Sequence, residues 1–425
     1  MWMRLAAFAA LVLGGCGFAS AQVSQTLTLD DVFARVADAH PDLRLYGARR
    51  DGLVAGLDAA ALRPSLVAGL QIENALGSGQ ARGFDAAEVT LTLASVIERG
   101  GKLDARRTLA QSRIDALAVQ REATRLDLLA EAARRYLAVV AARERRAIAA
   151  TDIAQRQRTV AAARQRLQAG ASPESVLLTA QAALARAELE RARSEQEQHA
   201  ARQHLAALWG ERAPIFDIAD ADPMQLPDIE DVEALASLLD ATPELARFSD
   251  ERRIGEARLQ LARSQARPDL EWQVGVRRLQ ADGDTALVGS LSMPLGASRR
   301  AQPAIRESGA ELAALEIERE AQGISLYSTL VEAHGRYRLA QLETRQLRDE
   351  VLPRLAKAES AAERAYRGGA ISYLEWAQLQ SERIAARRQQ LDAALDAQRA
   401  LIEIQRLTGQ SFVAGAVASM QGNTP

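Results

Sequence analysis

The sequence has very little cysteine and few aromatic residues. Cys16 is the single cysteine among 425 residues, and Phe, Trp and Tyr together make up 4%. One cysteine cannot form an intramolecular disulfide, so packing or assembly must hold the fold together. Hydrophobic residues still reach 48%, and alanine supplies many of them. This composition excludes a thick globular core and favours helices that pack closely side by side.

The chain also lacks an excess of charge of either sign. Lys and Arg number 53 against 55 Asp and Glu, which gives a net charge of −2. There is no excess of basic residues that would indicate nucleic-acid binding. Of the four histidines, His199 and His204 are five residues apart, a poor spacing for one helical face. No constellation of nucleophile, base or metal ligands is present, so we expect no enzyme, no cofactor and no metal site.

Long hydrophobic runs are confined to the N-terminus. Residues 5–15 form an apolar run behind Arg4 that is too short to span a bilayer, and we interpret it as an export signal. Two cleavage sites remain open. The Ala19-Ser20-Ala21 sequence would make 1–21 a signal peptide, whereas Leu13-Gly14-Gly15-Cys16 resembles a lipobox that would make Cys16 a lipidated first residue.

What the chain does have is a duplication. Four short motifs recur about 200 residues later, at offsets of 202, 204, 199 and 199: His40-Pro41-Asp42-Leu43 with Thr242-Pro243-Glu244-Leu245, Arg63-Pro64-Ser65-Leu66 with Arg267-Pro268-Asp269-Leu270, the turn at Gly170 with the turn at Gly369, and Leu208-Trp209-Gly210 with Leu407-Thr408-Gly409. A period this long is not that of a solenoid repeat. We therefore predict a first repeat over 22–210, a linker over 211–231, a second repeat over 232–409 and a tail over 410–425.

Each copy is predicted to contain helix, two strands, a very long helix, a tight turn and a return helix. In the first copy these fall at 28–62 (interrupted at Pro41), 64–73, 88–97, 102–168 and 173–208. In the second copy they fall at 232–266 (interrupted near Pro243), 269–277, 286–293, 303–366 (bent at Pro353) and 371–407. A helix over 102–168 would be about 100 Å long and needs partners along its whole length.

The four strands have the length and the alternation of transmembrane β-strands. Each is about ten residues with one apolar face, which suits lipid outside and water inside. Four strands cannot close a barrel, and an open edge cannot lie in lipid. Three chains would supply twelve strands. The predicted fold is therefore mainly α with β: a trimeric α-helical barrel continuous with a 12-stranded transmembrane β-barrel, four strands per chain.

Over its whole mature length the chain resembles the TolC-type outer membrane efflux proteins. The duplicated element order is that family's plan. Residues 96–102 (VIERGGK) resemble the strand-exit motif of its CzcC-like heavy-metal branch, although Arg99 stands where that branch usually has an apolar residue. Residues 365–375 (AYRGGAISYLE) resemble the second hairpin tip, and residues 166–173 resemble the first tip more loosely.

The resemblance implies a site at the tips of the two helical hairpins. Gly170, Ala171 and Ser172 in the first tip, and Gly368, Gly369 and Ala370 in the second, are expected to dock a periplasmic adaptor. Glu375 follows Gly369 by six residues, the spacing of the family's channel-constricting acids, and Gln378 takes the place of a second acid. Three copies of Glu375 would form a carboxylate ring that favours cations. Because Glu375 has no counterpart in the first copy, we expect the second hairpin to be the one that moves.

The resemblance further implies a homotrimer in the outer membrane, in contact with its lipid, with the helical part in the periplasm. It would be a passive exit duct, linked through the adaptor to an inner-membrane pump of the resistance-nodulation-division class. Heavy-metal cations are the expected cargo. Drug or organic-solute efflux by the same fold, and a soluble periplasmic coiled-coil scaffold or adaptor, are the alternatives.

Overall fold

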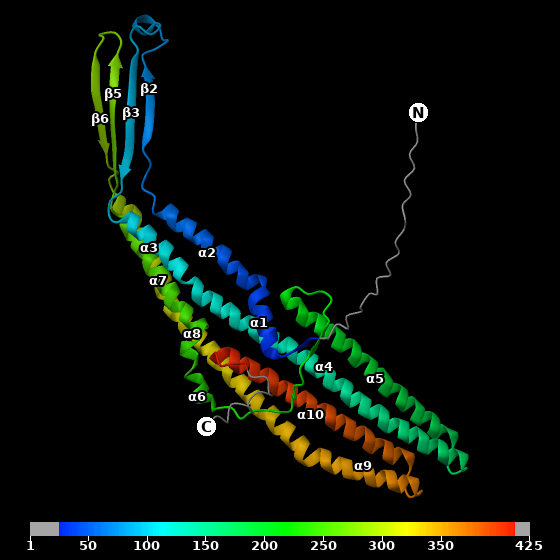
Figure 1. The fold of residues 1–425 in the computed structure, drawn as a ribbon. Coiled ribbons are helices and arrows are strands. Elements are labelled where there is room, and N and C mark those ends of the chain that lie inside the picture. The colour runs from blue at the N-terminus through cyan, green and yellow to red at the C-terminus, as the bar shows by residue number, and fades with distance from the viewer. Residues whose placement is uncertain (1–24, 413–425) are drawn as a thin grey trace, which may run out of the picture.

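A computed structural model describes residues 25–412 of the chain. The molecule is long: a layer of helices carries a four-stranded sheet at one end and two helical hairpin turns at the other (Figure 1). The predicted signal segment with Cys16, and the tail beyond residue 412, lie outside the described residues.

The first repeat has the predicted element order. Its helices and strands are α1 Leu29–Ala39, α2 Pro41–Ala60, β2 Val67–Glu73, β3 Glu88–Ile97, α3 Lys102–Asp115, α4 Leu117–Gln168 and α5 Glu174–Ala206, with single 3-10 turns at Gly79–Ala81 and Ala207–Trp209. His40 separates α1 from α2 because its extended backbone precedes Pro41, which is well placed at the first position of a helix.

The second repeat follows the same order. Its elements are α6 Val232–Ala236, a 3-10 turn at Leu239–Ala241, α7 Pro243–Ser264, β5 Leu270–Leu279, β6 Thr285–Ser292, α8 Ala297–Gln346, a π-helical turn at Leu347–Val351, α9 Leu352–Arg367 and α10 Tyr373–Thr408. The interruption expected at Pro353 is therefore present. Because proline has no N–H to give to a carbonyl four residues earlier, the helix locally adopts the wider π pattern just before it.

Three details differ from the expectations. The second long helix begins at Ala297 rather than Pro303: Gly296 in the left-handed region (φ 81°) is its N-cap, and Pro303 lies inside the helix. The first long helix is interrupted for one residue at Ala116. The linker contains strand β4, Phe216–Ile218, which pairs in parallel with β1, Gln25–Leu27. These strands are three residues long, too short for a periodic signal.

The sheet has the order β2-β3-β5-β6, so the two repeats meet at the antiparallel pair β3–β5. Its register puts Leu70, Leu91, Val276 and Leu287 opposite one another on one face. The row one residue along lies on the other face and consists of Gln71, Thr90, Arg277 and Ala286. One face of the sheet is thus apolar and exposed, and the other is polar, as the alternation predicted.

The core lies where the short strands and the linker cross the long helices. One buried cluster joins α1, β1 and β4 to the middle of α4, and a second joins α6 and α7 to α8 and α10. The linker is held by side chains of the long helices: the Tyr337 hydroxyl donates to the carbonyl of Pro227, and Gln398 Nε2 donates to the carbonyl of Gln225 (3.1 Å). Arg406 of α10 binds Glu244 of α7 (3.1 Å) and Asp127 of α4 (3.1 Å).

The sheet joins the helices through a cluster of ion pairs. The buried Lys102 Nζ lies 2.7 Å from Asp269 Oδ1, which also accepts the Arg99 N–H (3.0 Å). Arg106 binds the carboxylate of Glu98 through both terminal nitrogens. Gly100 (φ 82°) has no room for a Cβ, which would lie 2.8 Å from the Cβ of Arg267. The Glu98-Arg99-Gly100-Gly101-Lys102 sequence is therefore a structural joint between strand and helix.

Candidate functional site

Both helical hairpins end in the same type of turn. At the first tip the Ala171 N–H donates to the carbonyl of Arg166 (2.8 Å), with Gly170 in the left-handed region (φ 67°). At the second tip the Ala370 N–H donates to the carbonyl of Ala365 (2.9 Å), with Gly369 at φ 80°. This is the Schellman pattern of a helix C-terminus, which requires glycine at that position. The six predicted tip residues thus form two matching turns at the same end of the molecule (Figure 1), all exposed except the half-buried Ser172.

The two tips are joined by one arginine. Arg166 Nη1 donates to the carbonyl of Tyr366 (2.5 Å), and its guanidinium lies 5.0 Å from the centroid of the Tyr366 ring. Arg166 therefore links the last turn of α4 to the last turn of α9. The sequence pattern alone did not single it out.

An aromatic cluster supports the second tip. The Tyr366 ring centroid lies 5.1 Å from that of Trp376 and 6.4 Å from that of Tyr373. Trp376 is 1% exposed and packs beside Ala162 of α4. These aromatics therefore pack the hairpins against each other.

Polar contacts deeper in the layer also connect the two hairpins. Thr159 of α4 and Gln380 of α10 are both buried, and Gln380 Nε2 donates to Thr159 Oγ1 (3.0 Å). Within the second hairpin, the buried Glu359 of α9 pairs with Arg383 of α10. Because a buried polar group without its partner is costly, such pairs specify the register of the helices.

Glu375 is exposed and caps α10. Its carboxylate accepts the Ser372 N–H (2.7 Å), while Ser372 Oγ accepts the Glu375 N–H (3.3 Å), which completes a capping box. The bond from the Ser372 backbone is the main reason that the pKa of Glu375 lies below its usual value. The carboxylate is therefore held ionised and in a fixed orientation. Gln378 lies one turn further and donates to Glu382 (3.0 Å).

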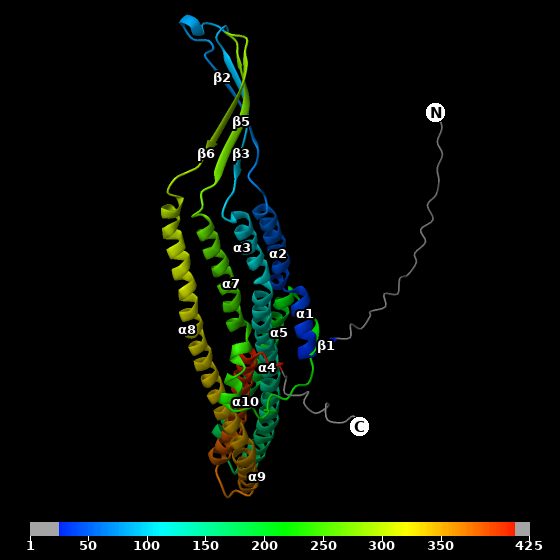
Figure 2. The same ribbon diagram turned by 90° about the vertical axis from the view of Figure 1, so that its left-hand side faces the viewer.

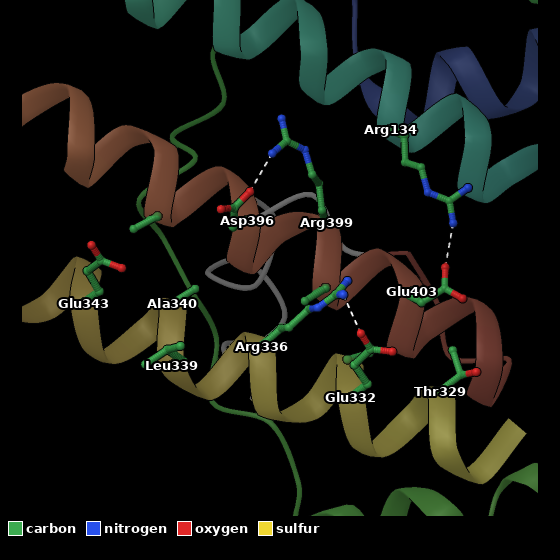
Figure 3. Close-up of a pocket in the computed structure, with 13 residues that line it drawn as sticks. Arg134, Thr329, Glu332, Arg336, Leu339, Ala340, Glu343, Asp396, Arg399 and Glu403 are labelled. Carbon is green, nitrogen blue, oxygen red and sulfur yellow. Dashed lines mark hydrogen bonds and ion pairs between the residues drawn. The ribbon is translucent and has the colours of Figure 1, made fainter. Parts of the chain in front are cut away.

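A groove of about 610 Å³ lies between α8 and α10, with Arg134 of α4 at its side (Figure 3). Small side chains line both helices, and each arginine has an acidic partner: Arg134 binds Glu403 (2.6 Å), Arg399 binds Asp396 (2.6 Å) and Arg336 binds Glu332. Among the described residues that line the groove there is no histidine, cysteine or serine. Its charges are internally paired, and it has no nucleophile–base arrangement.

The polar face of the sheet holds a further charged group. Arg277 of β5 binds Glu88 of β3 (2.9 Å) and approaches Glu73 of β2 (3.4 Å), and its Nε donates to Thr90 (3.0 Å). These contacts cross three strands at the end of the sheet that lies away from the helices. These contacts make this face of the sheet charged, in contrast to the apolar face.

In residues 25–412 no set of three or more His, Cys, Asp or Glu side chains is placed to hold a metal ion. Nor does any helix of that range have both the length and the apolar character needed to cross a membrane.

The architecture defines a class of elongated proteins in which two repeats each contribute a strand pair and a long helical hairpin. Residues 21–211 match the model of the outer membrane efflux protein family. The second repeat reproduces the same element order.

Known proteins are similar over most of the chain. The cobalt-zinc-cadmium resistance protein CzcC of Cupriavidus metallidurans is 28% identical over 317 residues, 74% of this chain and 75% of that protein. Among solved structures, CusC matches with a TM-score of 0.75 at 16% identity over 90% of this chain and 92% of that one. A membrane protein from Pseudomonas aeruginosa matches with a TM-score of 0.74 at 19% identity, over 90% and 93%. VceC from Vibrio cholerae matches with a TM-score of 0.70 at 16% identity, over 91% and 97%.

The first repeat thus matches the outer membrane efflux protein family, and the chain as a whole has the TolC-type fold. The match to an outer membrane efflux family model and the shared fold with the outer-membrane channel OprN agree with the expected localisation in the outer membrane, with the helical part in the periplasm. The expected fold class and localisation are thereby confirmed.

Proposed function

We propose that three copies of the chain form the outer-membrane channel of a tripartite efflux system, a passive exit duct for heavy-metal cations. The observation that carries the proposal is the sheet. One face is apolar and exposed, the other is polar, and the edge strands β2 and β6 have no outer partner within the described part of the chain. An unpaired edge is unstable in lipid, and pairing β6 with β2 of a neighbouring copy removes it.

A second unpartnered surface runs along α8, which lies at one side of the helix layer (Figure 2). Ile317, Ile324 and Val331 are spaced by seven residues and are 70%, 64% and 41% exposed. Apolar residues at this spacing favour packing against another long helix, as in a coiled coil. A neighbouring copy would cover this stripe at the same time as it closes the sheet.

The hairpin tips are proposed to dock the periplasmic adaptor and, through it, an inner-membrane pump of the resistance-nodulation-division class. The support is their position: both exposed turns lie at the end of the molecule opposite the sheet (Figure 1). Glu375 is proposed to form a carboxylate ring near the channel axis. The second hairpin is proposed to move during opening, because the π-helical turn at Leu347–Val351 interrupts it and Pro353 weakens its helix there.

Metal cations are proposed as cargo because of the similarity to CzcC and the strand-exit motif. A passive channel needs no catalytic groups, and we infer that the chain is not an enzyme. Drug or organic-solute efflux is the other candidate, favoured by the wide range of channels with this fold. Deleting the gene and scanning tolerance to Co²⁺, Zn²⁺, Cd²⁺ and a panel of drugs distinguishes them: loss of drug tolerance alone would overturn the metal assignment.

The duct itself is tested with the purified protein in a planar bilayer, where stepwise conductance is expected.

Pairing of β6 with a neighbour's β2 is tested by disulfide cross-linking. Leu70→Cys is combined with Leu287→Cys, or with a cysteine at neighbouring β6 positions, in a chain that also carries Cys16→Ser. A covalent ladder ending at three chains is expected. As a control, Leu70→Cys with Leu91→Cys joins two facing residues of one chain and should give no ladder. Protein that neither conducts nor forms a ladder would refute the proposal.

A further inference from the structure

The four connections between strands and helices lie at one level of the molecule (Figure 2). An exposed arginine lies in each connection or in the first turn of the helix that follows it. They are Arg63 before β2, Arg99 after β3, Arg267 before β5, and Arg299 with Arg300 after β6. We call these five residues the arginine collar.

The arginine collar has no internal counter-charge. None of its five guanidinium groups forms an ion pair with a residue in the described range 25–412. Two acids of the same strand–helix connections are already engaged, Asp269 by Lys102 (2.7 Å) and Glu98 by Arg106. Each protomer therefore presents surplus positive charge at this level.

The collar borders the apolar face of the sheet. Arg99 lies two residues beyond Ile97, the last residue of β3, and its Nη1 lies 3.8 Å from the Sδ of Met293. Leu66 and Leu295 beside the same junctions are 63% and 80% exposed. Arginine side chains extend their stems over apolar surface and place the charge at its boundary. The collar therefore lies where the proposed lipid-facing surface ends.

Arg299 and Arg300 carry an additional electrostatic cost. They lie in the first turn of α8, which contains no acidic residue and whose N-cap is Gly296, without a side chain to cap the helix. The N-terminus of a helix has partial positive charge, so cations there are destabilising unless an anion is nearby. An external anion would relieve both the repulsion and the unpaired guanidinium groups.

We propose that the arginine collar binds the phosphate headgroups of anionic phospholipids in the leaflet of the outer membrane that faces the periplasm. The inference rests on the proposed insertion of the sheet, with its apolar face toward lipid. Guanidinium groups bind phosphate through paired hydrogen bonds, and basic residues beside a membrane span attract anionic lipid. The periplasmic leaflet follows because the collar lies on the helix side of the sheet.

The test uses the purified full-length protein in a neutral detergent. Dispersed phosphatidylglycerol or phosphatidylcholine is added, and bound lipid is counted by native mass spectrometry. The wild type is expected to retain phosphatidylglycerol preferentially, with a preference that falls as salt rises. The variant combines Arg63→Gln, Arg99→Gln, Arg299→Gln and Arg300→Gln, and leaves Arg267, which packs over Gly100. Its preference should fall roughly fivefold for each arginine that engages a headgroup.

A matched control changes four exposed arginines along the helices that form no ion pair within the described range: Arg113→Gln, Arg146→Gln, Arg158→Gln and Arg186→Gln. It should keep the preference, since it lowers the net charge equally but leaves the collar intact. A collar variant that conducts like the wild type and keeps the preference would refute lipid binding by the arginine collar. It would leave the proposed channel function unaffected. Stronger retention of phosphorylated lipid A than of phosphatidylglycerol would refute the assignment of the collar to the periplasmic leaflet. A chain that never inserts would refute both proposals.

Discussion

Arg166, at the end of the first long helix, binds the carbonyl of Tyr366 at the end of the second, and its guanidinium lies over the same tyrosine ring at 5.0 Å. The two hairpin tips are thus held together by one side chain, although they are 200 residues apart in the sequence. Because the tips are the proposed constriction of the duct, this contact bears on how it opens.

We expect Arg166→Gln to increase conductance. A hydrogen bond from a charged donor contributes about 1.5–3 kcal/mol, and partial exposure reduces this to about 1 kcal/mol. The open fraction should therefore rise roughly fivefold. Single-channel recording of wild type and variant measures it. Arg164→Gln, an exposed arginine two residues earlier, is the control and should leave conductance unchanged. Equal conductance of Arg166→Gln and wild type would show that the contact does not restrain the tips.

The glycines of the tips should respond to alanine differently from a glycine within a helix. Gly170→Ala and Gly369→Ala force a side chain into the left-handed region and should each destabilise the protein by about 1 kcal/mol. Gly335→Ala in α8 meets nothing within 4 Å and should stabilise by about 0.5–1 kcal/mol. Thermal unfolding in detergent compares the three. A tip substitution that stabilises as much as Gly335→Ala would contradict the turn geometry.

Glu375 is expected to contribute to cation selectivity through its charge. Glu375→Gln removes the charge, but glutamine at this position also completes a capping box, so the helix start is preserved. The cation selectivity, measured as a reversal potential in a KCl gradient, should therefore decrease. Glu375→Ala loses the cap as well and should additionally lower stability. If Glu375→Gln keeps the wild-type reversal potential, the ring proposal fails.

The same carboxylate gives a pH dependence with a definite sign. Its hydrogen bonds to Ser372 lower the pKa of Glu375 in the folded protein. The stabilisation by the cap is therefore complete above the unfolded pKa of about 4.3 and is lost as pH falls through the lower folded pKa. Selectivity due to Glu375 should accordingly persist at pH 4.5. Loss of selectivity already between pH 6 and pH 5 would point to another group.

Tyr337 should be important for attachment of the linker. Burial raises the pKa of Tyr337 to about 12, and its hydroxyl donates to the Pro227 carbonyl. Tyr337→Phe should cost about 1 kcal/mol in unfolding free energy at pH 7. Because the folded pKa lies above the unfolded value of about 10, the stabilisation by Tyr337 is present below pH 10 and is lost as pH rises through 12. The variant should therefore lose less stability than the wild type over that range.

The control for Tyr337→Phe is Tyr327→Phe, in the same helix but 48% exposed. It should leave both the unfolding free energy and its alkaline pH dependence unchanged. Identical alkaline behaviour of wild type and Tyr337→Phe would mean that the linker is held by other contacts, such as Gln341 on the same carbonyl (3.1 Å).

Several features of the site were beyond prediction from sequence patterns. Arg166 carries no local signal, since its partner is a backbone carbonyl in the other repeat. Strands β1 and β4 are stable only because each provides the other's pairing partner, so neither shows a periodicity of its own. Lys102 and Asp269 are 167 positions apart, and their ion pair depends on the β3–β5 pairing between the repeats.

The sequence by itself determined the duplicated element order, the apolar alternation of the strands, the proline interruptions and the glycine turns. These are local properties, because backbone sterics and side-chain periodicity act within a few residues. The tertiary structure alone decided which strands pair, which arginine joins the tips and which arginines at the foot of the sheet remain without a counter-charge. Such contacts depend on distances between segments hundreds of residues apart, which are set only when both repeats pack into one layer.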